Sequence, residues 1–369
     1  MSGLTAAPAA VRPGPPLRVA ILAAARFAIC EPFVGGLEAH TWQLAAGLRR
    51  RGHQVTVFAG AGSDPDLDVR AFAGGRPRVS PAARSDISTA PDTAMVDHHA
   101  YLSTMLELGR HGDRSFDVVH NNSVHHLPLA MAPMVPLPQV TTLHTPPTPW
   151  MEMAIQTSPE PLPVKFCAVS RHTARAWRAT VPDAQVVANA VDLDAWTPGP
   201  GGHGAVWSGR IVPEKGLHLA IDAARLAGFS LRFAGPALDR AYWRREIEPR
   251  LGPDASWAGH LHRSELCRLV GSSAVAIVSP RWDEPFGLVA LEALASGTPV
   301  AGLDRGGLSE VLDASCSRLV GDEDVDRLAV AIRTAATLSR TAARRRAELI
   351  GSAERMIDEY VELYRSCLR

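Results

Sequence analysis

The chain has 369 residues, which is enough for two domains of ordinary size. Its 38 basic and 38 acidic side chains balance, and this argues against the capture of nucleic acid by charge as the main activity. No apolar run is long enough to form a transmembrane segment. Five scattered cysteines without CxxC spacing predict a reducing, cytoplasmic location, with neither a disulfide framework nor a structural zinc.

The N-terminal part of the chain predicts a tail followed by a βαβ unit. Residues 1–16 are rich in Ala and Pro and are expected to be a disordered tail. Arg18 to Ala24 is a continuously apolar run, typical of a strand buried on both faces. The Gly35-Gly36 loop, helical spacing of apolar residues from Glu38 to Arg51 and a second apolar strand from Gln54 to Ala59 complete the unit.

Further short apolar strands follow up to residue 188, and each ends in polar side chains. Such endings are typical of the carboxyl edge of an open parallel sheet, where ligands bind. These polar residues are His120-Asn121-Asn122, His144, Ser170 and Asn189.

Residues 194–204 are dense in proline and glycine and predict a linker between two domains. Residues 17–193 and 205–353 show the same alternation of strands, loops and helices, so we expect two similar doubly wound α/β domains. Near the C-terminus, helices are predicted over residues 327–348 and 354–369.

The segment from Asp283 to Val300 is the most informative for function. Glu284 precedes a Pro-Phe-Gly turn that opens a helix, and Glu292 lies about two turns inside that helix. The free N–H groups at a helix start favour an anion. Two acids beside an anion site fit a ligand with phosphate between two hydroxyl-bearing ends, such as a nucleotide sugar. Ordinary helix-start chemistry, with Glu284 as a first-turn acid, is the simpler alternative.

Together these segments resemble the retaining glycosyltransferases of family 4, in which two Rossmann-like domains face each other across a cleft (the GT-B architecture). The resemblance runs from Gly35 to near Tyr360. It implies a donor-binding domain over residues 205–353 and an acceptor-binding domain over 17–193, completed by a C-terminal helix at about 354–369. The matching motifs are Gly35-Gly36-x-Glu38, His144, Ser170, Asn189 to Asp192, Gly209-Arg210 with Lys215-Gly216, and Glu284-x7-Glu292 with Gly297-x-Pro299-Val300.

The resemblance also implies roles for individual residues. Arg210 and Lys215 would neutralise the donor diphosphate, the first as a planar fork and the second as a point charge. Glu284 would hold hydroxyls of the transferred sugar, Glu292 would accept hydrogen bonds from the ribose, and His144 would assist transfer by hydrogen bonding. The remaining donor contacts that it implies are Gly35, Gly36, Gly209, His260, Leu261, Pro285, Phe286, Gly287 and Leu288.

Acceptor contacts are predicted at His120 and Asn121, at Asn189, and at Trp150 in the apolar segment after the His144 loop. Ala190 stands where the family usually has glycine, and its Cβ would either shift the backbone or narrow the acceptor's access to the site. The sequence does not specify which acceptor is used.

Neither a cofactor nor a catalytic metal is expected. Adjacent histidines diverge on a strand and splay on a helix, so His98-His99 and His125-His126 are interpreted as non-ligands. Asp64/Asp66 and Asp192/Asp194 lie in turn-like or linker surroundings, where turn chemistry is the better interpretation.

The predicted function is metal-independent, retaining transfer of a sugar from a nucleoside diphosphate sugar, with UDP expected, to an acceptor hydroxyl. The Ala, Arg and Pro usage suggests a bacterial pathway for a natural product or glycoconjugate. A nucleotide-sugar epimerase on the same fold and a catalytically silent sugar-nucleotide binding protein stay open as alternatives, and so does the oligomeric state. A dinucleotide oxidoreductase is disfavoured because no GxGxxG follows Leu22.

Overall fold

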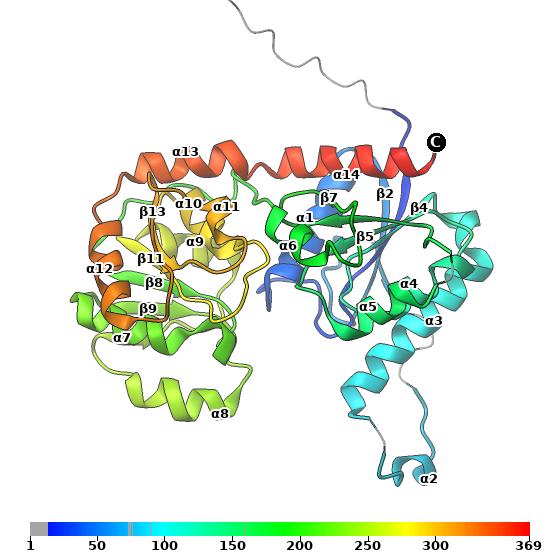
Figure 1. The fold of residues 1–369 in the computed structure, drawn as a ribbon, viewed down its shortest axis with the longest axis horizontal. Helices are drawn as coiled ribbons and strands as arrows, with labels where there is room; N and C mark the ends of the chain where they lie inside the picture. The colour runs from blue at the N-terminus through cyan, green and yellow to red at the C-terminus, as the bar shows by residue number, and fades with distance from the viewer. Residues whose placement is uncertain (1–13, 73–74, 76, 89, 159) are drawn as a thin grey trace, which may run out of the picture.

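A computed structural model describes residues 14–369 except 73–74, 76, 89 and 159 (Figure 1). Two α/β lobes lie side by side, and helices α13 and α14 run along one edge of both (Figure 1). The tail predicted over residues 1–16 falls mostly outside the described residues, and residues 14–16 have no regular secondary structure.

The first lobe is built on seven parallel strands in the order β3-β2-β1-β4-β5-β6-β7. The strands are β1 (Arg18–Leu22), β2 (Gln54–Ala59), β3 (Val69–Ala71), β4 (Val118–Asn121), β5 (Gln139–Leu143), β6 (Val164–Ala168) and β7 (Gln185–Val186). The helices are α1 (Gly36–Arg50), α2 (Pro81–Arg84), α3 (Asp92–Ser115), α4 (Leu127–Ala130), η1 (Ala132–Met134), α5 (Pro149–Gln156) and α6 (Arg171–Trp177).

The second lobe has six parallel strands in the order β10-β9-β8-β11-β12-β13. The strands are β8 (Ala205–Ser208), β9 (Leu231–Ala234), β10 (Ala255–Trp257), β11 (Val275–Val278), β12 (Val300–Leu303) and β13 (Ser317–Val320). The helical segments are η2 (Pro213–Lys215), α7 (Leu217–Ala227), α8 (Arg240–Tyr242), η3 (Trp243–Ile247), η4 (Glu248–Arg250), α9 (Arg263–Gly271), α10 (Leu288–Ala295), α11 (Leu308–Val311), α12 (Val325–Ala335), α13 (Arg340–Ile350) and α14 (Ala353–Cys367).

In both sheets the chain starts near the middle and winds outward in both directions, as in a Rossmann domain. The predicted fold class, two doubly wound parallel-sheet domains, is therefore confirmed. The ligand-binding edge of such a sheet is the carboxyl end of its strands.

Strand β1 shows why its sequence is apolar without interruption. Val19 and Ile21 point to the face covered by α1 and α14, while Ala20 and Leu22 point to the face covered by α3. Because successive side chains of a strand alternate between faces, a strand with helices on both sides needs apolar residues at every position.

The last helix, α14, crosses from the second lobe and packs on the first (Figure 1). Its Tyr364 hydroxyl lies 2.5 Å from Nδ1 of His120, and its Tyr360 hydroxyl lies 3.2 Å from Oγ1 of Thr142. Both tyrosines are fully buried. The final helix therefore belongs to the core of the first lobe.

One predicted helix, over residues 327–348, is wrong as a single element. The chain leaves the helical path between α12 and α13, and the Ser339 side chain accepts a hydrogen bond from the Ala342 amide to begin α13. Such a cap satisfies an amide that has no partner inside the helix. Among the described residues, no helix is both long and apolar enough to cross a membrane.

We predict that Tyr364→Ala lowers stability by about 3–5 kcal/mol, because it empties a fully buried aromatic site. Tyr364→Phe keeps the ring and removes only the hydroxyl, so it should cost less, about 1–3 kcal/mol for leaving His120 without its partner. Thermal unfolding measures both. Leu368→Ala, at an exposed position of the same segment, is the control, and equal effects of all three changes would contradict the prediction.

Candidate functional site

A pocket of about 430 Å³ lies between the two lobes, and residues of both line it. The second lobe contributes the ends of β8 and β11 and the start of α10, and the first lobe contributes the start of α1 and the His144 loop. The pocket therefore lies at the carboxyl edges of both sheets, where their topology places a ligand.

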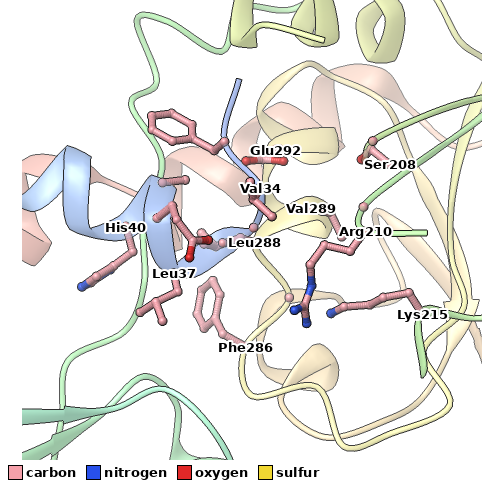
Figure 2. A pocket seen from close by; sticks show the side chains of 18 of the residues that line it. Val34, Leu37, His40, Ser208, Arg210, Lys215, Phe286, Leu288, Val289 and Glu292 are labelled. Carbon is pink, nitrogen blue, oxygen red and sulfur yellow. The ribbon is translucent and has the colours of Figure 1, made fainter. Parts of the chain in front are cut away.

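Two cations from the second lobe converge in this pocket. Figure 2 shows the Arg210 and Lys215 side chains with their charged ends turned toward the same point. The Lys215 amine donates to Oε2 of Glu284 at 2.6 Å and lies 5.0 Å from the centre of the Trp282 ring, whose N–H donates to the same oxygen at 3.0 Å. The Lys215 and Glu284 side chains are only 20% and 14% exposed, so solvent screens this pair less than a surface pair.

Helix α10 points its N-terminus into the pocket. Its N-cap is Gly287, at a φ of 100°, and no side chain caps the first amides. A Cβ at Gly287 would lie 2.4 Å from Cδ2 of Leu308, so both the backbone angle and the packing require glycine. Uncapped amides at the positive end of a helix form an anion site. Helix α10 has eight residues, so its dipole is that of a short helix.

Glu292 is the fifth residue of α10, so it lies about one turn inside the helix and not the two turns predicted, and it lies apart from the two cations (Figure 2). Burial raises the pKa of this carboxyl group to about 8. The positive charge of Arg263 lowers the pKa, but by less. The carboxyl group is therefore largely protonated at neutral pH, and it can both donate and accept a hydrogen bond.

The glycines at the start of α1 allow the two lobes to approach closely. A Cβ at Gly36 would lie 3.0 Å from Cδ1 of Leu288, and a Cβ at Gly35 would lie 3.1 Å from Oε2 of Glu38 and 3.8 Å from Cδ of Arg210. Glu38 itself is buried, and burial raises its pKa while hydrogen bonds to backbone amides and the charge of Arg210 lower it. The first turn of α1 thus lies directly against the cationic side of the pocket.

His144 lies on the first-lobe wall of the pocket, where its Nε2 lies 2.9 Å from Oδ1 of Asn122. Burial, followed by the neighbouring His40 and His120, lowers its pKa well below the ordinary value. The imidazole is therefore neutral at physiological pH. It can exchange hydrogen bonds with a ligand but does not carry a positive charge into the pocket.

Three buried polar atoms around His144 lack hydrogen-bond partners: Nε2 of His40, Nδ2 of Asn122 and Oδ1 of Asn189. The His40 ring meets the His144 ring edge-on at 4.9 Å, and both His40 and Asn189 line the pocket. Burial lowers the pKa of His40 to about 4, and Asn189 acts in the opposite direction, but no well-formed hydrogen bond joins the two side chains. Unpaired buried polar groups are costly, so this wall is suited to a ligand with hydroxyl groups.

The structure brings most of the predicted site residues to this one pocket. Those that line it are His144, Arg210, Lys215, Glu284, Gly35, Gly36, Gly209, His260, Leu261, Pro285, Phe286, Gly287, Leu288, Glu292 and Asn189. Their individual roles stay predictions.

Three predicted acceptor residues do not line the pocket. His120 and Asn121 are fully buried inside the first lobe, where they bond to Tyr364 and Thr142 and to Thr141. These two side chains do not reach the pocket, because the last side chains of β4 face the layers that cover the sheet and not the open edge. Trp150 is 65% exposed and stacks on His126, outside the pocket.

Several contacts across the lobes were not predicted from the sequence. Arg263 forms an ion pair with Glu31 at 3.2 Å, and Nε2 of His260 lies 2.9 Å from the Phe33 carbonyl. His260 therefore bridges the lobes as well as lining the pocket. In the sequence, Arg263 stands at the start of a helix that follows a glycine turn. This position indicates the edge of the sheet, but it does not indicate that Glu31 is the partner of Arg263.

A second group of contacts joins the lobes at α6. The Ser170 hydroxyl donates to the Pro285 carbonyl at 2.6 Å, so the predicted Ser170 position meets the Pro-Phe-Gly turn directly. Glu310 accepts hydrogen bonds from the Arg171 and His172 amides at 3.0 and 2.6 Å, and thus caps a helix of the opposite lobe.

Residues 34–195 match the family described as Glycosyltransferase Family 4, and residues 204–353 match the family described as Glycosyl transferases group 1. A phosphatidyl-myo-inositol mannosyltransferase of Mycolicibacterium smegmatis is 30% identical over 324 residues, covering 81% of this chain and 80% of that protein. The chain belongs to this family of glycosyltransferases. It is also 28% identical to a glycogen synthase of Mycobacterium tuberculosis over 349 residues, 82% of each chain.

Among solved structures, the chain is similar to Anabaena HepE, crystallised in complex with UDP and glucose, with a TM-score of 0.74 and 18% identity. The similarity covers 95% of this chain and 100% of that one. It confirms the GT-B arrangement of the glycosyltransferase, with two Rossmann-like domains on either side of the pocket.

We predict that Glu292→Gln makes the ligand-free protein more stable near pH 7 and removes part of its pH dependence. The pKa of about 8 in the folded protein lies above that of a glutamate in the unfolded chain. The free energy of unfolding of wild type is therefore undiminished by this group in acid, and it falls as the pH rises from about 4.5 to 8. Thermal unfolding from pH 4.5 to 8.5 should show a rise of a few degrees for the variant at pH 7–8 and little difference at pH 4.5. Glu160→Gln, at an exposed position, is the control, and parallel profiles of wild type and Glu292→Gln would contradict the prediction.

Proposed function

We propose that this glycosyltransferase moves a sugar from a nucleoside diphosphate sugar to an acceptor hydroxyl, with retention of the anomeric configuration and without a metal ion. The observation that carries the proposal is the convergence of Arg210 and Lys215 on the pocket into which α10 points its uncapped start. Two cations and a row of free amides match a diphosphate.

The donor would lie along the second-lobe wall of the pocket. Its diphosphate would replace Glu284 as the partner of Lys215, which frees the Glu284 carboxylate, now 2.6 Å from that amine, to accept hydrogen bonds from sugar hydroxyls. The ribose would meet Glu292, whose largely protonated carboxyl can donate as well as accept. UDP is the proposed nucleotide, in keeping with the HepE structure, which holds UDP.

The acceptor hydroxyl would attack the anomeric carbon from the side of the departing diphosphate. The new C–O bond forms as the bond to the diphosphate oxygen breaks, and a phosphate oxygen takes the hydroxyl proton. Arg210 and Lys215 would stabilise the negative charge that develops on the leaving group. Neutral His144, held by Asn122 at 2.9 Å, would orient the transferred sugar by hydrogen bonding.

Metal independence is consistent with the distribution of possible ligands. Among the described residues, the only group of three or more possible metal ligands lies outside this pocket. The charge on the diphosphate would be balanced by Arg210, Lys215 and the start of α10.

Nucleotide binding in EDTA tests the donor site. We expect UDP or a UDP-sugar to raise the unfolding temperature of wild type clearly and that of Glu292→Ala less, because Ala removes both hydrogen-bonding groups, with Glu160→Ala behaving as wild type. If no nucleotide stabilises wild type, or if NAD does so instead, the proposed donor site is refuted. Donor binding without any turnover on an acceptor panel would favour a silent binding protein, and an epimerised free donor would favour an epimerase.

We predict that Arg210→Ala lowers kcat about 10²–10³-fold, because a preorganised positive group at the leaving diphosphate is lost. Arg210→Lys should recover part of the rate, since it keeps the charge but loses the two-pronged fork. Arg327→Ala, a largely exposed arginine of the same lobe, is the control and should keep full activity. Equal turnover of Arg210→Ala and wild type would remove Arg210 from the proposed mechanism.

The stereochemistry is tested separately. With a donor of α configuration, retention predicts an α-linked product, which proton NMR of the anomeric signal identifies at early times. A β-linked product would show inversion and would exclude the same-side attack, while leaving the donor site itself intact.

A further inference from the structure

Three histidines meet on the first lobe, outside the catalytic pocket. His98 lies in the second turn of α3, and His125 and His126 lie in the loop between β4 and α4. One ring nitrogen from each lies within 4.8 Å of the other two. The expectation that adjacent histidines diverge is wrong here, because the rings of His125 and His126 stack with their centres 4.3 Å apart and their planes 25° apart.

Neighbouring aromatic rings hold this cluster in place. Tyr101 stacks on His125 at 4.6 Å and Trp150 stacks on His126 at 5.0 Å, so four rings form one continuous stack from the lobe interior to its surface. The Tyr101 hydroxyl accepts from the Ala25 amide and donates to the Ala23 carbonyl, which fixes the inner end of the stack to the segment after β1. His98 packs against both loop histidines at 6.1 Å.

Two of the three imidazoles, those of His125 and His126, have lowered pKa values. Burial, and after it the other histidines of the cluster, lowers the pKa of His125 to about 4 and also lowers the pKa of His126. Neutral imidazole is the form that binds metal ions. Three imidazole nitrogens are a donor set that suits Zn²⁺, Co²⁺, Ni²⁺ and Cu²⁺.

We propose that His98, His125 and His126 bind one divalent transition-metal ion of the zinc class, with water as the fourth ligand. This is a site of its own: none of the three residues lines the catalytic pocket, and the inference does not rest on the proposed donor chemistry.

Loading the ion requires small local changes. With Zn–N bonds of about 2.0–2.1 Å in a tetrahedron, ligand nitrogens lie about 3.3 Å apart, so the present spread within 4.8 Å must contract by side-chain rotation. The stacked rings must also turn, because ring lone pairs lie in the ring planes. Nδ1 of His125 now accepts from the Leu127 amide at 3.2 Å, and binding through Nε2 moves a proton to Nδ1 and costs this hydrogen bond.

The ion would tie α3 to the loop after β4. That loop contains Val124, which lines the catalytic pocket on the first-lobe side. Metal binding is therefore expected to stabilise the first lobe and to fix the pocket wall next to Val124, while the reaction itself draws on other residues.

Titration of tag-free, metal-stripped protein with ZnCl₂ tests the site by calorimetry, with CoCl₂ absorption as a second readout of tetrahedral coordination. We expect one ion per chain, at least tenfold weaker binding for His98→Gln and for His126→Gln, and unchanged binding for His111→Gln. His98 and His111 are both exposed on α3, so the two variants are expected to fold alike. They differ because only His98 belongs to the histidine cluster.

Absence of binding by wild type, or equal binding by wild type and His98→Gln, would overturn the proposal; the latter would mark an adventitious ion only. UDP-sugar binding by the same samples keeps the two inferences separate. A protein that binds zinc through these histidines but no nucleotide would refute the donor site alone, and the reverse pattern would refute the metal site alone.

Discussion

The close approach of two helix starts across the lobes is the constraint on which the pocket depends. The first turn of α1 and the first turn of α10 face each other, and Gly36 would place a Cβ only 3.0 Å from Leu288. A side chain at Gly36 would press on Leu288 of the opposite lobe, whereas a Cβ at Gly35 would meet Glu38 of its own lobe and lie at ordinary contact distance from Arg210. Gly36 therefore serves the distance between the lobes as much as the conformation of a loop.

Charge in the pocket is arranged unevenly between the two lobes. The second lobe provides Arg210, Lys215 and the positive end of α10, while the first lobe provides neutral His144 with unpaired polar atoms of His40 and Asn189. Burial keeps His144 neutral and Glu292 largely protonated, so the convergent Arg210 and Lys215 mark the second-lobe wall as the side for a negative group. A ligand with a charged and an uncharged end has one favoured orientation in such a pocket.

The sheet topology and the donor side of the pocket were predictable from the sequence. Continuous apolar strands, glycine turns and the spacing from Glu284 to Glu292 are local patterns, and the residues they mark lie in consecutive turns of one element or at the end of one strand. Helix α3 and strand β13 were not predicted. The acceptor side was predicted less well. His120 and Asn121 end β4, which lies inside the sheet, so His120 is buried under α14 and Asn121 is buried on the opposite face of the sheet.

The sequence by itself determined the family, the two doubly wound domains and the residues of the donor motifs, because periodicity and motif spacing act over short distances along the chain. Only the tertiary structure decided which side chains meet across long separations. Examples are the Lys215–Glu284 pair, the Glu310 cap on α6, the Arg263–Glu31 bridge and the meeting of His98 with His125 and His126. Such contacts depend on how whole elements pack, and a local pattern carries no information about the partner on the other element.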